Sequence, residues 1–325
     1  MSVTSPQARV AVPERLLLAA PRGYCAGVDR AVQAVERALE LYGPPVYVRK
    51  EIVHNKHVVA GLRDRGAIFV DEETEVPKGE TVVFSAHGVA PSVHENSVAR
   101  NLQTIDATCP LVTKVHVEAK KFAAEGYTIV LIGHAGHEEV EGTMGEAPGN
   151  IVLIETEADV ERLEVEDPDR VAFISQTTLS VDETNTIILK LREKFPNITG
   201  PRTDDICYAT TNRQMAVRQM ARECDLVLVI GSKNSSNSNR LVEVAHDHGA
   251  DSYLIDNESQ VREEWLEGKR VVGISSGASA PEELVQSLVA FFRARGTTDV
   301  SEFEVVQEDV RFMLPKEIRR ALAAR

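Results

Sequence analysis

Short, almost continuously apolar runs alternate with amphipathic stretches along most of the chain. Strands that are buried on both faces, as in parallel sheets, have this composition because neither face meets water. The alternation therefore predicts an α/β fold with mainly parallel sheets. The runs that we interpret as strands are Leu16–Ala20, Thr81–Ala86, Thr128–Gly133, Val171–Ser175, Asp225–Gly231 and Arg270–Ser275.

Helices are expected between these runs. After the first run, one helical face carries Val28, Val32, Val35, Leu39 and Tyr42, and Gly43-Pro44-Pro45 would end that helix. Pro110 suits the first position of a second helix. The sequence Thr211-Asn212-Arg213-Gln214 has the form of a capping box, which predicts a helix that begins there.

The length of 325 residues exceeds the size at which one core usually keeps growing, so two or three domains are expected. The order of strands and helices predicts three similar small α/β domains. We expect a flexible tail over residues 1–14 and a first domain over 15–110, which contains Cys25. A second domain over 111–208 would open at Cys109, and a third over 209–296 would open at Cys207. Residues 297–325 would form a C-terminal tail that packs back on the body.

Composition and charge narrow the class of protein. Hydrophobic residues make up 43% of the chain and charged residues 26%, as in soluble globular proteins. The net charge of −14 gives no basic surface for nucleic acid. No apolar stretch approaches the roughly 18 residues of a membrane helix, and the start lacks the features of a signal peptide. These observations predict a cytoplasmic enzyme without a membrane or nucleic-acid partner.

Three of the four cysteines stand where an apolar run gives way to an expected helix: Cys25, Cys109 and Cys207. Four cysteines are too few for a disulfide scaffold, and no Cys-x-x-Cys pair suggests structural zinc. A helix N-terminus lowers the pKa of a thiol and favours the metal-binding thiolate. Three thiolates can hold an iron–sulfur cluster and leave one iron open to a substrate. Cys224 begins an apolar run, and we expect it in the core.

Polar clusters follow the ends of several expected strands, where parallel sheets bind their ligands. Glycines and small polar residues before a helix expose N–H groups and hydroxyls that suit a phosphate. Neither a P-loop nor a Gly-x-Gly-x-x-Gly motif occurs, which argues against nucleoside triphosphates and dinucleotides. The clusters are His54-Asn55, Ser85–Val89, Gly133–Glu139, Ser175–Thr178, Ser232–Asn239 and Ser275–Pro281.

Taken in order, these segments resemble the 4-hydroxy-3-methylbut-2-enyl diphosphate reductases, iron–sulfur enzymes of the non-mevalonate isoprenoid pathway. The resemblance extends over most of the chain, and the combination of motifs is specific although no single motif is. The matching segments are Arg22–Val28, Glu51–Asn55, Ser85–Val89, Asp106–Val112, Gly136–Thr143, Ser175–Ser180, Asp205–Cys207, Gly231–Leu241 and Gly277–Pro281.

The resemblance implies three α/β domains arranged as a cloverleaf around a central 4Fe-4S cluster. It implies that Cys25, Cys109 and Cys207 ligate three irons, while the fourth iron takes the substrate's hydroxyl. Glu139 and Thr177 would deliver protons. The reaction would be reductive removal of the hydroxyl to give isopentenyl and dimethylallyl diphosphate, with ferredoxin or flavodoxin as electron donor. The residues implied around the diphosphate are His54, His87, His137, Ser235, Ser236, Asn237 and Ser279.

One residue departs from the family pattern. The family often has proline between the motif histidine and glutamate, where this chain has Glu138. A carboxylate that pointed inward could raise the pKa of Glu139, and we expect Glu138 to face solvent instead.

Two other functions are compatible with a three-cysteine cluster. One is a different cluster dehydratase on three α/β modules, such as quinolinate synthase. The other is a cluster-bearing redox sensor that binds a partner protein, which would need no phosphate pocket. The residues that argue against both are His54, His87, His137, Glu139 and the run Ser235–Asn237.

Overall fold

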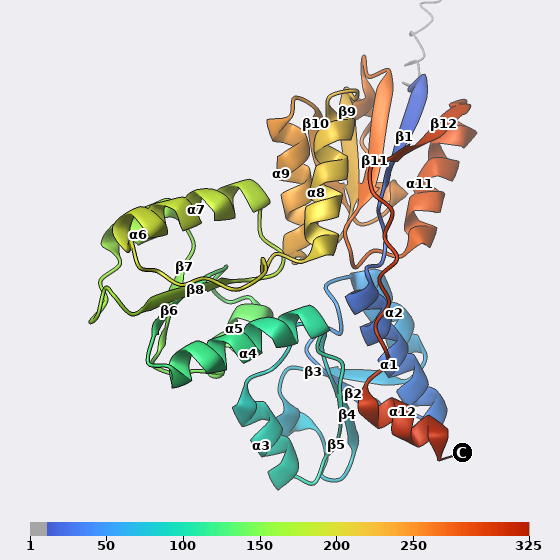
Figure 1. Ribbon diagram of the computed structural model, residues 1–325. Helices are drawn as coiled ribbons and strands as arrows, with labels where there is room; N and C mark the ends of the chain where they lie inside the picture. The colour runs from blue at the N-terminus through green and yellow to red at the C-terminus, as the bar shows by residue number, and fades with distance from the viewer. Residues whose placement is uncertain (1–11, 325) are drawn as a thin grey trace, which may run out of the picture. The chain divides into compact units, whose positions relative to one another are not determined.

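The computed structural model describes residues 12–324 and contains three parallel β-sheets with helices packed on their faces (Figure 1). Two compact units make up the chain. One comprises the chain up to Gly23 together with Asn212–Glu308, and the other comprises Tyr24–Thr211 together with the chain from Asp309 on. The five-stranded sheet lies in the first unit, and the four-stranded and three-stranded sheets lie in the second. The predicted α/β class with parallel sheets is confirmed.

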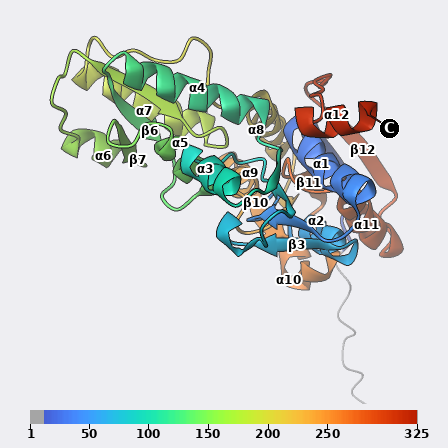
Figure 2. The same ribbon diagram turned by 90° about the horizontal axis from the view of Figure 1, so that it is seen from below.

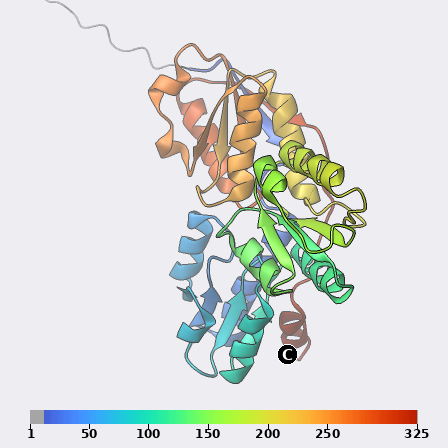
Figure 3. The same ribbon diagram turned by 90° about the vertical axis from the view of Figure 1, so that its left-hand side faces the viewer.

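The five-stranded sheet has the order β10-β9-β11-β1-β12. One of its faces packs on α11 (Glu282–Ala294), and the other on α9 (Ser236–Asp247) and the later turns of α8 (Tyr208–Ala221), as Figures 1 and 3 show. Cys224 is buried on the α8 side, as expected for a core thiol. The strands are β10 (Asp251–Ile255), β9 (Leu226–Ile230), β11 (Val271–Ser276), β1 (Arg15–Ala20) and β12 (Asp299–Glu304).

The first strand does not belong where we expected it. Residues 15–110 were expected to form one domain, but β1 pairs with β11 on one side and with β12 on the other. The residues near 300 are likewise a strand of this sheet and not part of a tail. Of the expected N-terminal tail, Pro13 accepts a hydrogen bond from Thr297 and Glu14 donates one to Arg270. Residues 1–11 of that tail lie outside the described residues.

The four-stranded sheet has the order β3-β2-β4-β5. It lies in the unit that contains Tyr24–Thr211, in the first half of that segment. Its strands are β3 (Ala67–Val70), β2 (Val46–Arg49), β4 (Thr81–Phe84) and β5 (Gln103–Asp106). One face packs on α1 (Ala26–Tyr42), α2 (Lys56–Asp64) and α12 (Lys316–Ala323), and the other on α3 (Pro91–Ala99). Figure 2 shows α12 beside α1, so the C-terminal segment does pack back on its own unit.

The three-stranded sheet has the order β7-β6-β8, with β7 (Ile151–Ile154), β6 (Thr128–Ile132) and β8 (Val171–Ser175). Alternate residues of its strands face opposite layers of helices. One layer is α4 (Pro110–Ala124) with α5 (Glu138–Gly145), and the other is α6 (Glu157–Arg162) with α7 (Val181–Lys194). Between residues 12 and 324 we find no helix with the length and apolarity needed to cross a membrane.

Helix ends follow the sequence signals in most places. The predicted face of α1 is buried at Val28, Val32, Val35 and Leu39, whereas Tyr42 is exposed at the last turn. The predicted start at Thr211 is wrong, because α8 begins at Tyr208, directly after Cys207. Cys207, and not Thr211, therefore directly precedes the first residue of this helix.

A buried guanidinium stabilises the unit that holds the five-stranded sheet. Arg213 is fully buried, donates from Nη2 to the carbonyl of Gly23 at 2.8 Å, and pairs with Glu308 at 3.1 Å. Removing the charge of the carboxylate weakens a desolvated ion pair that water cannot replace.

We expect Glu308→Gln to lower the free energy of unfolding by about 2 kcal/mol, the value typical of a hydrogen bond to a charged group. Urea unfolding, with the midpoint compared at equal m-value, measures this change. The matched control is Glu304→Gln, at an exposed position nearby. Equal midpoints for the two variants would show that the ion pair between Arg213 and Glu308 does not contribute to the free energy of unfolding.

Candidate functional site

The predicted polar clusters lie at the carboxyl ends of parallel strands, where ligands bind in such sheets. In the unit with two sheets, His54 follows β2, His87 follows β4 and His137 follows β6, while Thr177 follows β8. In the other unit, the segments before α9 and α11 follow β9 and β11 in the same way.

All three predicted cluster cysteines belong to the unit Tyr24–Thr211, and each directly precedes a helix: α1, α4 or α8. A methyl group at Gly27 would lie 2.6 Å from Sγ of Cys109 and 3.8 Å from Sγ of Cys25, so both sulfurs lie within 4 Å of one point. The N–H of Ala26 donates to the hydroxyl of Tyr208 at 3.3 Å, which joins the start of α1 to the start of α8. The three segments therefore converge, although they are far apart in sequence.

The thiols of Cys109 and Cys207 are not acidified in the way that we predicted. Burial raises the pKa of Cys109 to about 12, and the nearby Cys25 and Cys207 raise it further than the helix N–H groups lower it. Burial and Cys25 similarly raise the pKa of Cys207 to about 11. The helix N-termini do donate to these sulfurs, but desolvation outweighs that effect.

The donor set fits an iron–sulfur cluster. Three soft sulfur atoms share one largely buried place, and a positively charged metal centre would compensate the mutual repulsion of three thiolates there. Among the described residues, Gly27 is the position whose missing side chain leaves room beside two of the sulfurs.

The three predicted histidines form one cluster. The rings of His54 and His87 stack with their centroids 4.0 Å apart, and the ring of His137 meets them edge-on at 5.2 and 5.7 Å. All three are histidines from strand ends of a single unit, which confirms that they lie together.

The ring of His137 has a fixed proton position. Its Nδ1 accepts a hydrogen bond from the N–H of Glu139 at 3.1 Å, as the N-cap of α5. Burial and the neighbouring rings lower the pKa of His137 to about 3. The ring is therefore neutral, with its proton on Nε2, and Nε2–H is its free donor.

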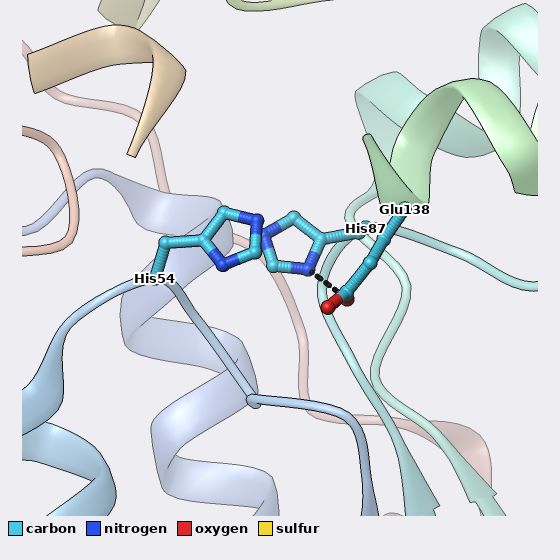
Figure 4. Close-up of side chains that lie close together, drawn as sticks. All are labelled: His54, His87 and Glu138. Atoms are coloured by element: carbon cyan, nitrogen blue, oxygen red, sulfur yellow. Dashed lines mark hydrogen bonds and ion pairs between the residues drawn. The ribbon is translucent and has the colours of Figure 1, made fainter. Parts of the chain in front are cut away.

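Glu138 does not face solvent as we expected. Its Oε2 lies 3.0 Å from Nδ1 of His87, and the side chain is 19% exposed (Figure 4). Burial alone would raise the pKa of Glu138, but the hydrogen bond with His87 and the charges of His87, His54 and Lys50 lower it below its ordinary value. The carboxylate is thus ionised and can only accept hydrogen bonds.

Potential ligand atoms of His54, His87 and Glu138 lie within 4.8 Å of one another, as a metal site would require. A metal must lie near the plane of each imidazole, about 2.0–2.1 Å from its nitrogen. The rings of His54 and His87 are stacked with only 19° between their planes, so their lone pairs do not point at one common ion. The ring geometry therefore argues against a cation chelated by both histidines.

Glu139 and Thr177 are in direct contact and buried, with exposures of 2% and 5%. The N–H of Thr177 donates to Oε1 of Glu139 at 2.7 Å, and the hydroxyl of Thr177 lies 3.1 Å from Oε2. Burial raises the pKa of Glu139 to about 7, against the lowering effect of these two hydrogen bonds. The carbonyl of Thr177 accepts the N–H of Cys207 at 3.0 Å. A continuous set of hydrogen bonds thus joins the acid to a cysteine.

The remaining predicted residues belong to the other unit. Ser235 caps α9 and its hydroxyl accepts that of Ser238 at 2.9 Å. Asn237 is 4% exposed, and neither its Nδ2 nor its Oδ1 has a hydrogen-bond partner among residues 12–324. An added methyl at Gly277 would lie 3.5 Å from Nδ2 of Asn237, which places that amide beside the loop that carries Ser279. Buried amides without partners are rare and indicate a ligand.

Sequence reasoning missed several residues that shape the site. Gly27 leaves space for sulfur, and its position two residues after Cys25 was the available signal. Thr210 lies with its hydroxyl 3.2 Å from Sγ of Cys207. Asp205 accepts from the N–H of Ser175 at 2.9 Å, which fixes the segment that leads to Cys207. Asp205 stands in the motif that we noted, but only the fold gives it a partner.

The family model described as "LytB protein" matches residues 16–293. The curated 4-hydroxy-3-methylbut-2-enyl diphosphate reductase of Acidothermus cellulolyticus is 61% identical over 312 residues, which cover 96% of this chain and 92% of the relative.

Two solved structures are also similar. The E-1-hydroxy-2-methyl-but-2-enyl-4-diphosphate reductase of Plasmodium falciparum superposes with a TM-score of 0.93 at 37% identity, over 96% of this chain and 99% of the other. A second structure, titled as (E)-4-hydroxy-3-methyl-but-2-enyl diphosphate reductase, the terminal enzyme of the non-mevalonate pathway, has a TM-score of 0.62 at 32% identity. It covers 86% of this chain and 99% of the other. Since the family model covers well over half of the chain, the chain belongs to the LytB protein family.

Proposed function

We propose that this chain is the oxidoreductase that removes the hydroxyl group of 4-hydroxy-3-methylbut-2-enyl diphosphate in the non-mevalonate pathway. The C–O bond breaks, the hydroxyl leaves as water with one proton, and a second proton and two electrons convert the allyl group into isopentenyl or dimethylallyl diphosphate. The observation that carries this proposal is the hydrogen-bonded set Glu139–Thr177–Cys207, which joins a buried acid to the converging cysteines. The names of the relatives support it.

For the cofactor we propose a 4Fe-4S cluster on Cys25, Cys109 and Cys207. Three thiolates would leave one of the irons without a cysteine ligand. When bound, the cluster would relay the two electrons from the donor and supply a Lewis acid for the departing hydroxyl. The chain contributes the space beside Gly27 and the helix N–H groups that donate to the sulfurs.

Glu139 is the proposed proton source. A carboxyl group with a raised pKa still holds its proton near neutral pH, and a general acid must do so. Thr177 holds both carboxyl oxygens, through its N–H and its hydroxyl, and so fixes the direction of the acid. Its hydroxyl can pass the proton onward to the substrate.

The diphosphate would bind to the histidine cluster of His54, His87 and His137, whose rings supply N–H donors at strand ends. Asn237 is a further proposed ligand, as the family resemblance implies, and its buried amide, which has no hydrogen-bond partner among residues 12–324, supports this part of the proposal. Binding energy from the diphosphate would orient the reacting end of the molecule. The further residues proposed as ligands are Ser235, Ser236 and Ser279.

Ferredoxin or flavodoxin is the proposed electron donor, as the family resemblance implies, and the cytoplasm is the location proposed from the sequence. A redox sensor would need neither the buried acid of raised pKa nor the histidine cluster. A quinolinate synthase would not account for the family match over residues 16–293. The reductase is therefore the function that these observations support best.

Gly27→Ala tests the convergence of the sulfurs. The added methyl would lie 2.6 Å from Sγ of Cys109, a distance at which the sulfur must move. We expect the iron and sulfide content of anaerobically purified protein to fall at least about tenfold, because each 1.4 kcal/mol of strain costs a factor of ten in affinity.

The control for this variant is Gly61→Ala in α2, where an added methyl meets nothing within 4 Å. It should keep its iron and sulfide. Full iron and sulfide in Gly27→Ala would mean that the cluster does not lie beside this glycine.

Glu139→Gln removes the acidic proton of the side chain and keeps the size and shape of that side chain. Loss of a general acid costs about 10²–10⁴ in rate, so turnover should fall by that factor while iron content stays normal. Steady-state kinetics with the hydroxy-diphosphate and a chemical reductant measure the effect, with Glu141→Gln, an exposed position of α5, as the control. Near-normal turnover with a complete cluster would remove Glu139 from the mechanism.

The pH dependence of turnover follows from the raised pKa of Glu139, about 7. The acid is protonated below this value and ionised above it, so kcat should fall about tenfold per pH unit on the alkaline side. A viologen reductant is suitable because its one-electron potential does not depend on pH. A kcat that stays constant from pH 7 to about 9 would contradict the assignment.

A further inference from the structure

An open hollow of about 480 Å³ lies between α1, the residues around the start of α4, and the C-terminal segment with α12. All of these elements belong to one unit, Tyr24–Thr211 with the chain from Asp309 on, and Figure 2 shows α12 beside α1. We call it the basic hollow, and its lining includes Arg30, Thr108, Pro110, Arg311, Lys316 and Arg319.

The basic hollow reaches the residues on either side of a proposed cluster ligand. Thr108 and Pro110 both line it, and Cys109 stands between them in the chain. Neighbouring Cα atoms are about 3.8 Å apart, so a molecule that contacts either residue lies one residue away from this cysteine. An electron that enters here would have a short covalent path to the sulfur.

Arg30 of α1 fixes the two sides of the hollow to each other. Its Nη1 donates to the carbonyl of Thr108 at 2.9 Å, and its Nε donates to the carbonyl of Met313 at 2.9 Å. The next helix, α12, is anchored by Ile318, which is fully buried in the core that α1 also forms. The surface is therefore a fixed part of this unit.

Positive charge predominates in the lining, although the chain as a whole carries a net charge of −14. Four cationic side chains and two carboxylates, those of Asp106 and Glu317, line the hollow. Arg311, Lys316 and Arg319 are exposed, and Lys316 approaches Glu317 to no less than 3.8 Å. An acidic molecule is thus attracted to this surface, while the net charge of the chain repels it elsewhere.

Exposed apolar groups lie among these charges. The side chain of Met313 is 72% exposed, and the half-buried Phe312 lines the hollow beside it. Methionine, aromatic residues and arginine are enriched at protein–protein interfaces, where an apolar centre is surrounded by a polar rim. The composition of this surface therefore fits a protein partner better than a small anion, which would gain nothing from the exposed methionine.

We propose that the basic hollow docks an acidic electron-carrier protein, which passes its electrons to the cluster through the segment Thr108–Pro110. This inference rests on the proposed function, because it takes Cys109 as a ligand of the cluster that receives the electrons. Each turnover consumes two electrons, so a reduced one-electron carrier docks and is oxidised twice. Complementary charge would raise the rate of encounter and orient the carrier.

Carbodiimide cross-linking locates the partner without relying on turnover. The reagent joins a lysine amine to a carboxylate in contact with it, and the side chain of Lys316 is 67% exposed. With the anaerobically prepared holoenzyme and oxidised flavodoxin or ferredoxin, mass spectrometry should find cross-linked peptides that contain Lys316. The comparison residue is Lys78, exposed in the turn before β4, at the opposite edge of the four-stranded sheet from Cys109.

Lys78 should give no cross-link to the carrier. Cross-links at Lys78 and none at Lys316 would overturn the proposal. Links from Lys316 to a second copy of this chain, with none to the carrier, would assign the surface to self-association and overturn it as well.

Charge reversal in the hollow should slow turnover only when a protein supplies the electrons. We expect Arg311→Glu and Lys316→Glu each to lower kcat/KM for the reduced carrier about tenfold at low salt, because electrostatic steering raises association rates roughly 10- to 10³-fold. The difference should shrink near about 1 M salt, where the screening length is about 3 Å. With saturating methyl viologen, a small cation that needs no basic surface, kcat should stay the same.

The matched control is Lys78→Glu, which changes the net charge by the same amount and should leave kcat/KM for the carrier unchanged. An equal loss in Lys78→Glu and Arg311→Glu would show that only net charge matters, and would overturn the proposal. Unchanged carrier kinetics in both hollow variants would also overturn it. So would an equal loss with methyl viologen in both, which would place the defect in the enzyme itself.

The proposed function fails separately from this inference. If the unmodified holoenzyme reduces the hydroxy-diphosphate neither with viologen nor with a carrier protein, the proposed function is wrong. If viologen supports turnover and neither flavodoxin nor ferredoxin does, the acidic carrier is wrong. If a carrier supports turnover equally in the hollow variants and the unmodified protein, only the docking surface is wrong.

Discussion

Three thiols that share one largely buried place are the constraint on which the site depends. Burial and neighbouring cysteines raise the pKa of Cys109 and Cys207, and a bound metal centre would compensate the charge of these two thiolates. A bound cluster would also need space beside these sulfurs, and Gly27 leaves that space because it has no side chain. The hydrogen bond from Cys207 to Thr177 then ties the sulfur site to the acid of Glu139. The proposed cluster site and the proposed proton source therefore belong to one connected piece of the fold.

The buried strands and several helix starts could be predicted from the sequence, because the residue patterns that specify them are local. Apolar runs gave the buried strands, and Pro110 gave the start of α4. The carboxyl ends of neighbouring parallel strands meet at one edge of a sheet, which accounts for the closeness of His54 and His87 after β2 and β4, whereas His137 follows β6 of another sheet. The family resemblance then assigned roles to residues whose positions the strand pattern had already made plausible.

Other features depend on distant contacts that leave no local trace. The partner of β1 is chosen by parallel pairing with strands near residues 270 and 300, and nothing within Arg15–Ala20 specifies that choice. The direction of Glu138 follows from the docking of α5 through Gly142 and Gly145, so a reading of its neighbours in sequence placed it in solvent. The thiol pKa was misjudged for a similar reason, since helix N-termini are visible in a sequence and desolvation is not.

The most direct test of the account is ⁵⁷Fe Mössbauer spectroscopy of the anaerobically prepared protein, recorded with and without the hydroxy-diphosphate. Three cysteine ligands on a cluster of about four irons predict one iron site whose spectrum changes when the substrate is added, while the other three keep theirs. Spectra in which every iron is unaffected or all respond alike would contradict the account. Iron content that survives replacement of Cys25, Cys109 and Cys207 by serine would contradict it as well.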